Sequence, residues 1–365
     1  MKKLRVGVIF GGRSGEHEVS LNSANSILTA LDREKYDVIP IGINKAGRWL
    51  IGAEPSQVLA EGGFGPQLIP AALIPDPSEA RLVPLAGGEA NSLDVVFPVL
   101  HGTYGEDGTV QGLLELANIP YVGSGVLGSA VGMDKIVMKR IFAQVGLPQG
   151  RFSAFTRKQW ESSPESVLAE VENGLGYPCF VKPANMGSSV GINKARDRDG
   201  LVRALQVAAK YDRRLVVEEF IDGREIEVSV LGNDEPVASL PGEIIPCNDF
   251  YDYKAKYVDG DSALIIPAEL PDSTVASIRR YAVRAFAALD CAGLARVDFF
   301  VSRKDGSVLI NEVNTMPGFT SISMYPKLWD ASGIAYSELL DKLIQLAIDR
   351  HLEKNRSKTT YELDD

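Results

Sequence analysis

The stretch RVDFFVSRKDGSVLINEVN, residues 296–314, has the pattern of a β-hairpin with polar side chains on one face. Its Lys-Asp-Gly segment predicts a three-residue loop with Gly306 in the left-handed conformation. In that register Asp298 lies opposite Glu312, and the arginine that opens the stretch lies opposite Asn314. Two carboxylates and an amide are therefore expected to converge on this hairpin.

A magnesium site is the hypothesis that this set of polar groups favours. Oxygen ligands without histidine or cysteine suit Mg²⁺, which usually shares its coordination shell with substrate phosphates. The alternative is a solvated salt-bridge face around Arg296. That alternative explains the apolar neighbours in VDFF and VLI poorly, because buried carboxylates need a counter-charge or a metal.

The stretch VKPANMGSSVG, residues 181–191, predicts a flap between two strands. Lys182 ends an apolar run, and small and polar residues follow it. Such a flap can close over phosphates with backbone donors and two hydroxyls while the lysine supplies a point charge. The pattern G-x-x-x-x-G-K-[ST] is absent, so this is not a P-loop. A glycine hairpin with a solvated lysine is the alternative.

Two glycine-rich turns follow strand-like runs near the N-terminus. The first, FGGRSGEHEVS at 10–20, is not a dinucleotide fingerprint, because Phe10 stands where a glycine is required. It is either a tight βα turn or an anion-binding one, and one residue of its Glu-His-Glu cluster should face a substrate. In the second turn, LHGTYGEDGTVQG at 100–112, we expect His101 to be functional rather than a buried core histidine. The two turns could share one cleft.

Three domains are expected from the order of these patterns. Residues 1–125 form an N-terminal parallel α/β domain that carries a loop-rich insertion at 52–90. Residues 126–218 form a central α+β domain with the flap, and residues 219–365 form a C-terminal domain with the hairpin. A single helix is predicted at 128–145.

Composition limits the kinds of binding partner and the cellular location that we expect. The chain has 365 residues, 45% hydrophobic and 24% charged, and a formal charge of −10, which argues against nucleic acid as a partner. Its three cysteines lack the spacing of a zinc site or a disulfide framework. No apolar run approaches the ~20 residues that span a bilayer, so we expect a cytoplasmic protein without a membrane partner.

The motifs together resemble the ATP-grasp fold. They are the strand-Lys-Pro with its Gly/Ser flap, the VVEEF strand before I-D-G-R-E, and the D…E-x-N hairpin. More narrowly, six segments in this order resemble the D-alanine:D-alanine ligase family: GGRSGEHEVSLNSA, HGTYGEDGTVQG, VGSGVLGSAVGMDK, KPANMGSSVG, YDYKAKY and NEVNTMPGFTSIS. The resemblance implies a pre-ATP-grasp parallel-sheet domain followed by two α+β ATP-grasp domains.

The resemblance also implies a set of site residues. The catalytic residues would be Glu16, Ser188, Tyr257, Arg296 and Gly318, and the substrate-binding ones His101, Ser323 and Met324. ATP would be bound by Lys135, Lys182, Glu218, Glu219, Ile221, Glu225 and Lys256. Two Mg²⁺ ions, with Mn²⁺ as a substitute, would be held by Asp298, Glu312 and Asn314.

The implied activity is the ATP-dependent joining of two D-alanines through an acyl phosphate, for peptidoglycan precursor and cell wall synthesis by a homodimer. In it, Glu16 would receive the first amine and join Ser188 and Tyr257 in a hydrogen-bonded set that fastens the flap. Arg296 and the Gly318 N–H would meet the oxyanion. The alternatives are a D-alanine:D-lactate depsipeptide ligase and a non-catalytic ATP-binding module. The retained Tyr257 favours an amine nucleophile.

Overall fold

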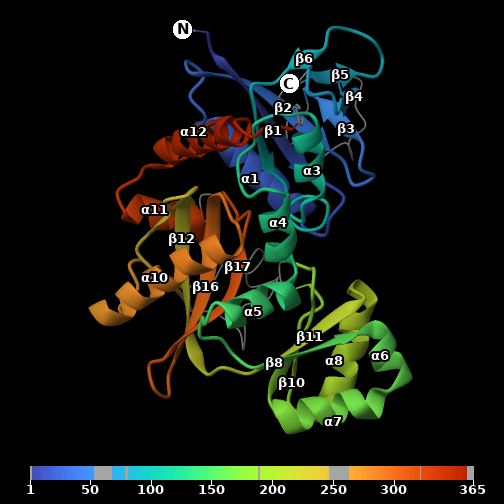
Figure 1. Cartoon of the computed structure of the whole chain (residues 1–365), viewed down its shortest axis with the longest axis vertical. Coiled ribbons are helices and arrows are strands. Elements are labelled where there is room, and N and C mark those ends of the chain that lie inside the picture. Colours follow the sequence, from blue (N-terminus) through green and yellow to red (C-terminus); the bar gives the residue numbers. More distant parts are fainter. Residues whose placement is uncertain are drawn as a thin grey trace, which may run out of the picture.

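The computed structural model describes residues 2–52, 68–78, 81–187, 190–245, 263–320 and 322–359. Their strands form three sheets of seven, four and six strands, and the third sheet lies between the other two along the molecule (Figure 1). The first sheet belongs to an α/β unit and the other two to α+β units. The fold class expected from the sequence is therefore confirmed.

The N-terminal sheet is mixed, with the strand order β6-β5-β4-β3-β2-β1-β7. Its strands are β1 (Leu4–Gly11), β2 (Tyr36–Ile43), β3 (Trp49–Ile51), β4 (Ile69–Leu73), β5 (Arg81–Pro84), β6 (Asn91–Ser92) and β7 (Val95–Val99). Strand β1 pairs in parallel with β2 and β7, and the remaining pairs are antiparallel. The parallel part holds the apolar runs that the sequence places in strands.

The expectation of a loop-rich insertion at 52–90 is wrong for the described part of that range. Strands β4 and β5 pair with each other there and extend the N-terminal sheet through β3. Buried Ala71, Leu73 and Leu82 attach them to the core. These strands are short and rich in proline and alanine, so their sequence lacks a clear period-two signal. Residues 53–67 and 79–80 lie outside the described residues.

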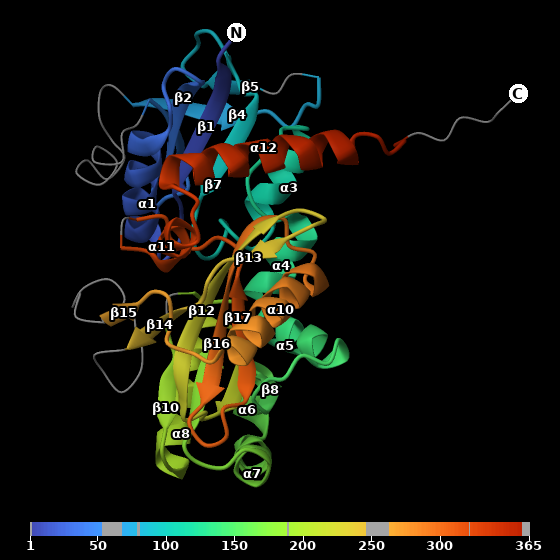
Figure 2. The ribbon, with the colours of Figure 1, turned by 90° about the vertical axis from the view of Figure 1, so that its left-hand side faces the viewer.

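Helices cover both faces of the N-terminal sheet. Helices α1 (His17–Ala30) and α12 (Tyr336–Lys354) share one core with β1 and β7, and α3 (Thr109–Leu116) packs on the other face. Helix α12 comes from the C-terminal end of the chain and crosses the N-terminal sheet (Figure 2). The last helix of the chain thus completes the first unit.

The predicted single helix at 128–145 is instead two helices, α4 (Val126–Met133) and α5 (Lys135–Gln144). Asp134 between them has extended backbone angles, and its side chain accepts hydrogen bonds from the N–H groups of Ile136 and Val137. This is the geometry of an N-cap, which starts a new helix. Met138 and Phe142 of α5 pack into the core of the third sheet.

The second sheet is antiparallel, with the order β10-β9-β11-β8. Its elements are β8 (Phe152–Thr156), α6 (Arg157–Ser162), α7 (Pro164–Gly174), β9 (Cys179–Pro183), β10 (Asn193–Ala195), α8 (Arg198–Tyr211) and β11 (Arg214–Glu219). Apolar side chains of α7 and α8 bury one face of this sheet, which leaves its other face for the site.

The third sheet has the order β15-β14-β12-β16-β17, with β13 paired to β12. Its elements are β12 (Gly223–Gly232), β13 (Val237–Ala238), β14 (Gly242–Ile245), β15 (Ala263–Ile265), α10 (Asp272–Ala288), β16 (Gly293–Ser302), β17 (Val308–Asn314) and α11 (Met324–Ala331). Helices α5 and α10 cover one face. None of the helices in the described ranges is long and apolar enough to cross a bilayer.

The β16–β17 hairpin has the predicted facing pairs, but its loop and its register differ from the prediction. Asp298 pairs with Glu312, and the arginine pairs with Asn314, as expected. Gly306 is left-handed, with φ of 71°. The three-residue loop is wrong, however, because the Ser302 N–H donates to the Ser307 carbonyl and leaves residues 303–306 as the loop. A register shift after Asp298 compensates for the added residue.

Candidate active site

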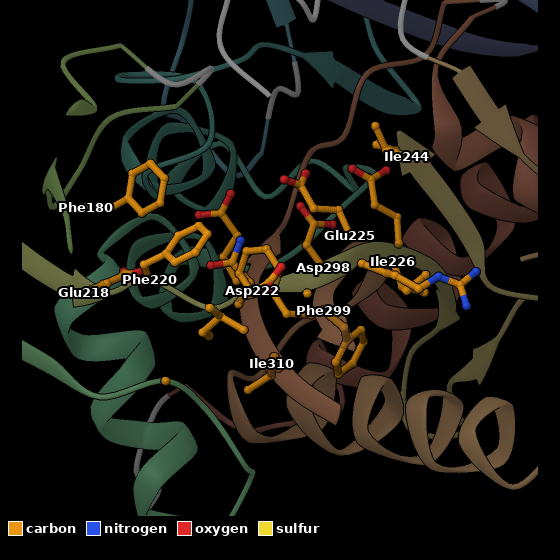
Figure 3. Close-up of a pocket in the computed structure, with 18 of the residues that line it drawn as sticks. Phe180, Glu218, Phe220, Asp222, Glu225, Ile226, Ile244, Asp298, Phe299 and Ile310 are labelled. Atoms are coloured by element: carbon orange, nitrogen blue, oxygen red, sulfur yellow. The ribbon is translucent and has the colours of Figure 1, made fainter. Parts of the chain in front are cut away.

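A cavity of about 320 Å³ opens between the second and third sheets (Figure 3). That volume lies within the range of small-molecule sites. Its wall is built by α5, β9, β11, β12, β14, β16 and β17. In Figure 3 the rings of Phe180 and Phe220 lie on one side of the view and the carboxylates of Glu225 and Asp298 on the other. The cavity thus joins an apolar wall to an acidic one.

Two lysines, Lys139 and Lys182, form an ionic cluster with Glu218 in the cavity wall, and Lys135 lies on the same helix as Lys139. Lys182 Nζ lies 2.8 Å from Glu218 Oε2, because β9 and β11 are antiparallel neighbours that place both residues on one face. Lys139 Nζ lies 3.4 Å from Glu218 Oε1. Lys135 Nζ donates to the Met186 carbonyl at 2.9 Å. Burial alone would raise the pKa of Glu218, but Lys139 and Lys182 hold it below its ordinary value.

The hairpin side chains face the same cavity. Lys135 Nζ lies 3.5 Å from Glu312 Oε2. Arg296 binds both oxygens of Asp298, at 2.7 and 2.8 Å, and its Nε lies 3.1 Å from Glu227 Oε2. Burial would lower the pKa of Arg296, but Asp298 and Glu227 raise it well above the ordinary value. The salt bridge is buried rather than solvated, with exposed side-chain fractions of 16% and 14%.

The donor set of the hairpin fits a hard divalent cation. Asp298 and Glu312 are register partners, and Asn314 stands on the same face of β17. Two carboxylates and an amide provide oxygen ligands of the kind that Mg²⁺ takes. Among the described residues, no group of three or more His, Cys, Asp or Glu is arranged to hold a metal. The third protein ligand here would therefore be the amide of Asn314.

Three more of the residues expected to bind nucleotide also line the cavity. Glu219, Ile221 and Glu225 are in its wall together with Glu218. Glu219 accepts from the backbone N–H of Arg151 at 2.7 Å, which ties the end of β11 to the start of β8. Ile221 packs so closely on Gly150 that a Cβ there would lie 2.9 Å from its Cδ1. The segment that follows β11 is thus fixed against the cavity wall.

The two N-terminal turns and the flap meet around Glu16, so the two turns lie side by side, as a shared cleft would require. Glu16 is 7% exposed. A Cβ on Gly102 would lie 2.7 Å from Glu16 Oε2, and a Cβ on Gly187 of the flap would overlap the same carboxylate. Ser14 Oγ donates to the His101 carbonyl at 2.7 Å and joins the two turns.

His101 is buried, at 4% exposed, which the sequence did not lead us to expect. Its Nδ1 lies 2.9 Å from the Met316 carbonyl and its Nε2 lies 3.2 Å from Ser23 Oγ. Burial lowers the pKa of His101, so the ring is neutral, with Nδ1 as donor and Nε2 as acceptor. His101 therefore joins the second turn to the segment after β17.

Gly318, Ser323 and Met324 lie together after the hairpin. Ser323 is the N-cap residue of α11, and Met324 is its first residue. A Cβ on Gly318 would lie 2.9 Å from Ser323 Oγ, and the Thr320 N–H donates to that hydroxyl at 3.0 Å. The expected residues Ser188, Lys256 and Tyr257 lie outside the described residues.

Three polar residues of the site were missed in the sequence. Lys139 follows Lys135 by four residues, so helical spacing could have placed both on one face of α5. Glu227 follows Glu225 on β12 at the period of a strand face. Glu106 is buried beside Glu16, and burial followed by the Glu16 charge raises its pKa to about 8. Nothing in the local sequence separates Glu106 from an exposed turn residue.

Two α+β units that enclose a cavity lined by lysines and carboxylates define an ATP-grasp protein, as the motifs led us to expect. Two family models match the chain, D-ala D-ala ligase N-terminus over residues 5–124 and D-ala D-ala ligase C-terminus over residues 141–345. The chain belongs to the D-alanine–D-alanine ligase family.

Relatives and solved structures match over nearly all of the chain. The D-alanine–D-alanine ligase of Natranaerobius thermophilus is 55% identical, covering 99% of both chains. The one of Ruminiclostridium cellulolyticum is 56% identical, covering 98% of this chain and 99% of the other. The structure of the Coxiella burnetii ligase has a TM-score of 0.85 at 39% identity, with 98% and 97% covered. The VanG D-Ala:D-Ser ligase of Enterococcus faecalis has a TM-score of 0.85 at 38% identity, with 95% and 100% covered.

Proposed function

We propose that this chain joins two D-alanines to D-alanyl-D-alanine with ATP, through an acyl phosphate, in peptidoglycan precursor synthesis for the cell wall. The observation that carries the proposal is at the flap. The carbonyl of Met186 accepts from Lys135, and the next residue, Gly187, touches the Glu16 carboxylate. A group suited to an amine thus lies next to a lysine suited to a phosphate, as phosphoryl transfer to an amino acid requires.

ATP would lie in the cavity with its base against the β11 end. The backbone of residues 218–221 and the Glu218 carboxylate would hold adenine, and Glu225 would take the ribose hydroxyls. Lys135, Lys182 and Lys256 would contact the phosphates. Lysine ammonium groups are point charges that suit phosphate oxygens. Lys182 would exchange its present partner, Glu218, for a phosphate.

Asp298, Glu312 and Asn314 would hold two Mg²⁺ ions, with Mn²⁺ as a substitute. When bound, the ions would neutralise charge on the transferring phosphoryl group. The protein's own part is to keep the oxygen donors on one face of the hairpin, as the pairing of β16 with β17 does.

The first D-alanine would bind with its amine at Glu16 and its carboxylate near His101. Its carboxylate oxygen attacks the γ-phosphorus, ADP leaves, and an acyl phosphate forms. The second D-alanine, with its carboxylate at Ser323 and the Met324 N–H, attacks through its neutral amine.

Arg296 and the Gly318 N–H would stabilise the tetrahedral oxyanion before phosphate leaves. Because acyl phosphates hydrolyse, the flap must exclude water. Ser188 and Tyr257 would fasten it to Glu16. We further propose a cytoplasmic homodimer.

The test is phosphate release from Mg-ATP by the purified protein. The assay compares four sets of substrates: D-alanine alone, L-alanine alone, D-alanine with D-lactate, and D-alanine with D-serine. The products are identified by mass. We expect release with D-alanine alone and a product of dipeptide mass. Removing Mg²⁺ with EDTA should abolish release, and excess Mg²⁺ should restore it.

The other outcomes separate the alternatives. Release only when D-lactate or D-serine is added would replace the second substrate and overturn the dipeptide proposal. ATP binding without release under any condition would favour the non-catalytic module.

A further inference from the structure

Lys139 is a buried ammonium that the proposed chemistry leaves without a role. It lies in the wall of the cavity and is 3% exposed. Its Nζ lies 3.4 Å from Glu218 Oε1, donates to the Asn311 carbonyl at 3.3 Å, and stands 6.0 Å from the centre of the Phe152 ring. Burying a lysine costs free energy unless an acid accompanies it, and Glu218 is the acid it meets.

Two lysines contact Glu218, and only one of them changes its partner under the proposed function. Lys182 Nζ binds Glu218 Oε2 at 2.8 Å, but under the proposed function it turns to the ATP phosphates. Lys139 sits inside α5, one turn after Lys135, and its contacts with Glu218, Asn311 and Phe152 come from three different elements. When nucleotide binds, Lys139 is therefore the positive charge that stays beside Glu218.

A counter-charge that stays in place when nucleotide binds matters because Glu218 would form a hydrogen bond with the base. An ionised carboxylate only accepts hydrogen bonds, whereas a protonated one also donates. The 6-amino group of adenine donates a hydrogen bond, and the 6-oxo group of hypoxanthine or guanine only accepts. A buried carboxylate that loses its counter-charge tends to take up a proton, and it would then accommodate either base.

We propose that Lys139 is a positioning residue that keeps Glu218 ionised when nucleotide is bound, so that the cavity selects 6-aminopurine over 6-oxopurine nucleotides. This inference rests on the proposed function, because it places the base of ATP beside Glu218. A site built to bind a donor rejects analogues that lack it far more strongly than an apolar pocket does. The selection is therefore expected to be large.

The test compares ATP with inosine triphosphate, whose base carries an oxygen in place of the 6-amino group and a proton on the adjacent N1. kcat/KM for each nucleotide is measured at saturating D-alanine. We expect the wild type to favour ATP by ~100-fold or more. Lys139→Met should lower that ratio by ~10-fold or more, through a higher KM for ATP with kcat largely kept. Lys139→Arg, which keeps the charge, should restore most of the ratio.

A matched control lies next to Lys139 on the same helix. Arg140 is exposed, and Arg140→Met removes one positive charge from α5 without touching the cavity wall. Its ATP to inosine triphosphate ratio should equal that of the wild type. Glu218→Gln, whose amide both donates and accepts, should raise relative use of inosine triphosphate. If Lys139→Met does not fold, Lys139→Gln is used for the same comparison.

The outcomes that contradict the inference are distinct from failure of the ligase itself. If the neutral Lys139 variant slows both nucleotides equally, Lys139 is only structural and the inference is overturned. If the wild type uses both nucleotides alike while making dipeptide, the cavity does not read the amino group, and the inference fails although the activity stands. If neither nucleotide supports phosphate release, the proposed function itself fails.

Discussion

Arg296 shows how one residue can carry a structural and a proposed chemical role together. Its guanidinium binds both oxygens of Asp298 and lies near Glu227. A planar, permanently charged fork suits this two-carboxylate environment better than a point charge. The same group lies on the hairpin face at which we propose that it stabilises the oxyanion.

We expect Arg296→Gln to lower kcat by ~100-fold or more, the effect typical of losing one oxyanion donor. It should also lower the free energy of unfolding by about 3 kcal/mol, because two buried carboxylates lose their counter-charge. The measurements are steady-state phosphate release and urea unfolding. Arg280→Gln, at an exposed position of α10, is the control and should change neither. Near-normal kcat in a folded Arg296→Gln protein would remove this residue from the mechanism.

At the scale of an element, α5 delivers two ammonium groups to two carboxylates. Lys135 reaches Glu312 and Lys139 reaches Glu218, one helical turn apart. The start of α5 is fixed by Asp134, which caps the helix and forms an ion pair with Arg214 of β11. The capping side chain therefore ties the start of α5, and with it Lys135, to the second sheet.

Asp134→Ala should lower the free energy of unfolding by about 1–2 kcal/mol for the lost cap alone, and further because Arg214 loses its partner. It should also raise KM for ATP, since Lys135 is the next residue. Asp134→Asn keeps a capping oxygen and loses the charge, so its deficit should be smaller. Urea midpoints and ATP kinetics of both variants measure this. An unchanged midpoint for Asp134→Ala would show that the cap does not stabilise the helix break.

At the scale of the whole molecule, the two ends of the chain are packed together. Helix α12 lies on the N-terminal sheet (Figure 2), and Leu343 and Ile344 share a core with Val6 and Phe97. Tyr36 donates to Asp341 of the same helix at 2.8 Å. The expected C-terminal domain of residues 219–365 therefore sends its last helix to the first sheet. The N-terminal sheet needs α12 to bury its face.

Leu343→Ala should lower the free energy of unfolding by about 2–5 kcal/mol, as cavity-forming changes at fully buried leucines do. The side chain is 0% exposed, whereas Leu352 on the same helix is 61% exposed. Leu352→Ala should therefore stay within ~0.5 kcal/mol of the wild type. Urea unfolding followed by circular dichroism compares the two. Equal midpoints would mean that α12 does not stabilise the first unit.

The hairpin marks how far the sequence alone could predict the site. The facing pairs of the hairpin, Asp298 with Glu312 and the arginine with Asn314, were predicted correctly, but the loop was one residue longer and a bulge restored the register. The helix break at Asp134 and the strands β4 and β5 were not predicted. In those segments the local pattern is weak, and pairing with distant strands or a cap decides the structure.

The sequence by itself determined the class of fold, the family resemblance and the facing of the hairpin side chains. Those features depend on strand periodicity, glycine positions and local spacing, which are written in consecutive residues. Only the tertiary structure decided that Lys139 meets Glu218, that Glu16 touches Gly187 of the flap, and that α12 completes the first sheet. Each of these contacts joins residues far apart in the chain. Their partners are set by how buried faces pack and by how buried charges are paired, which no single segment encodes.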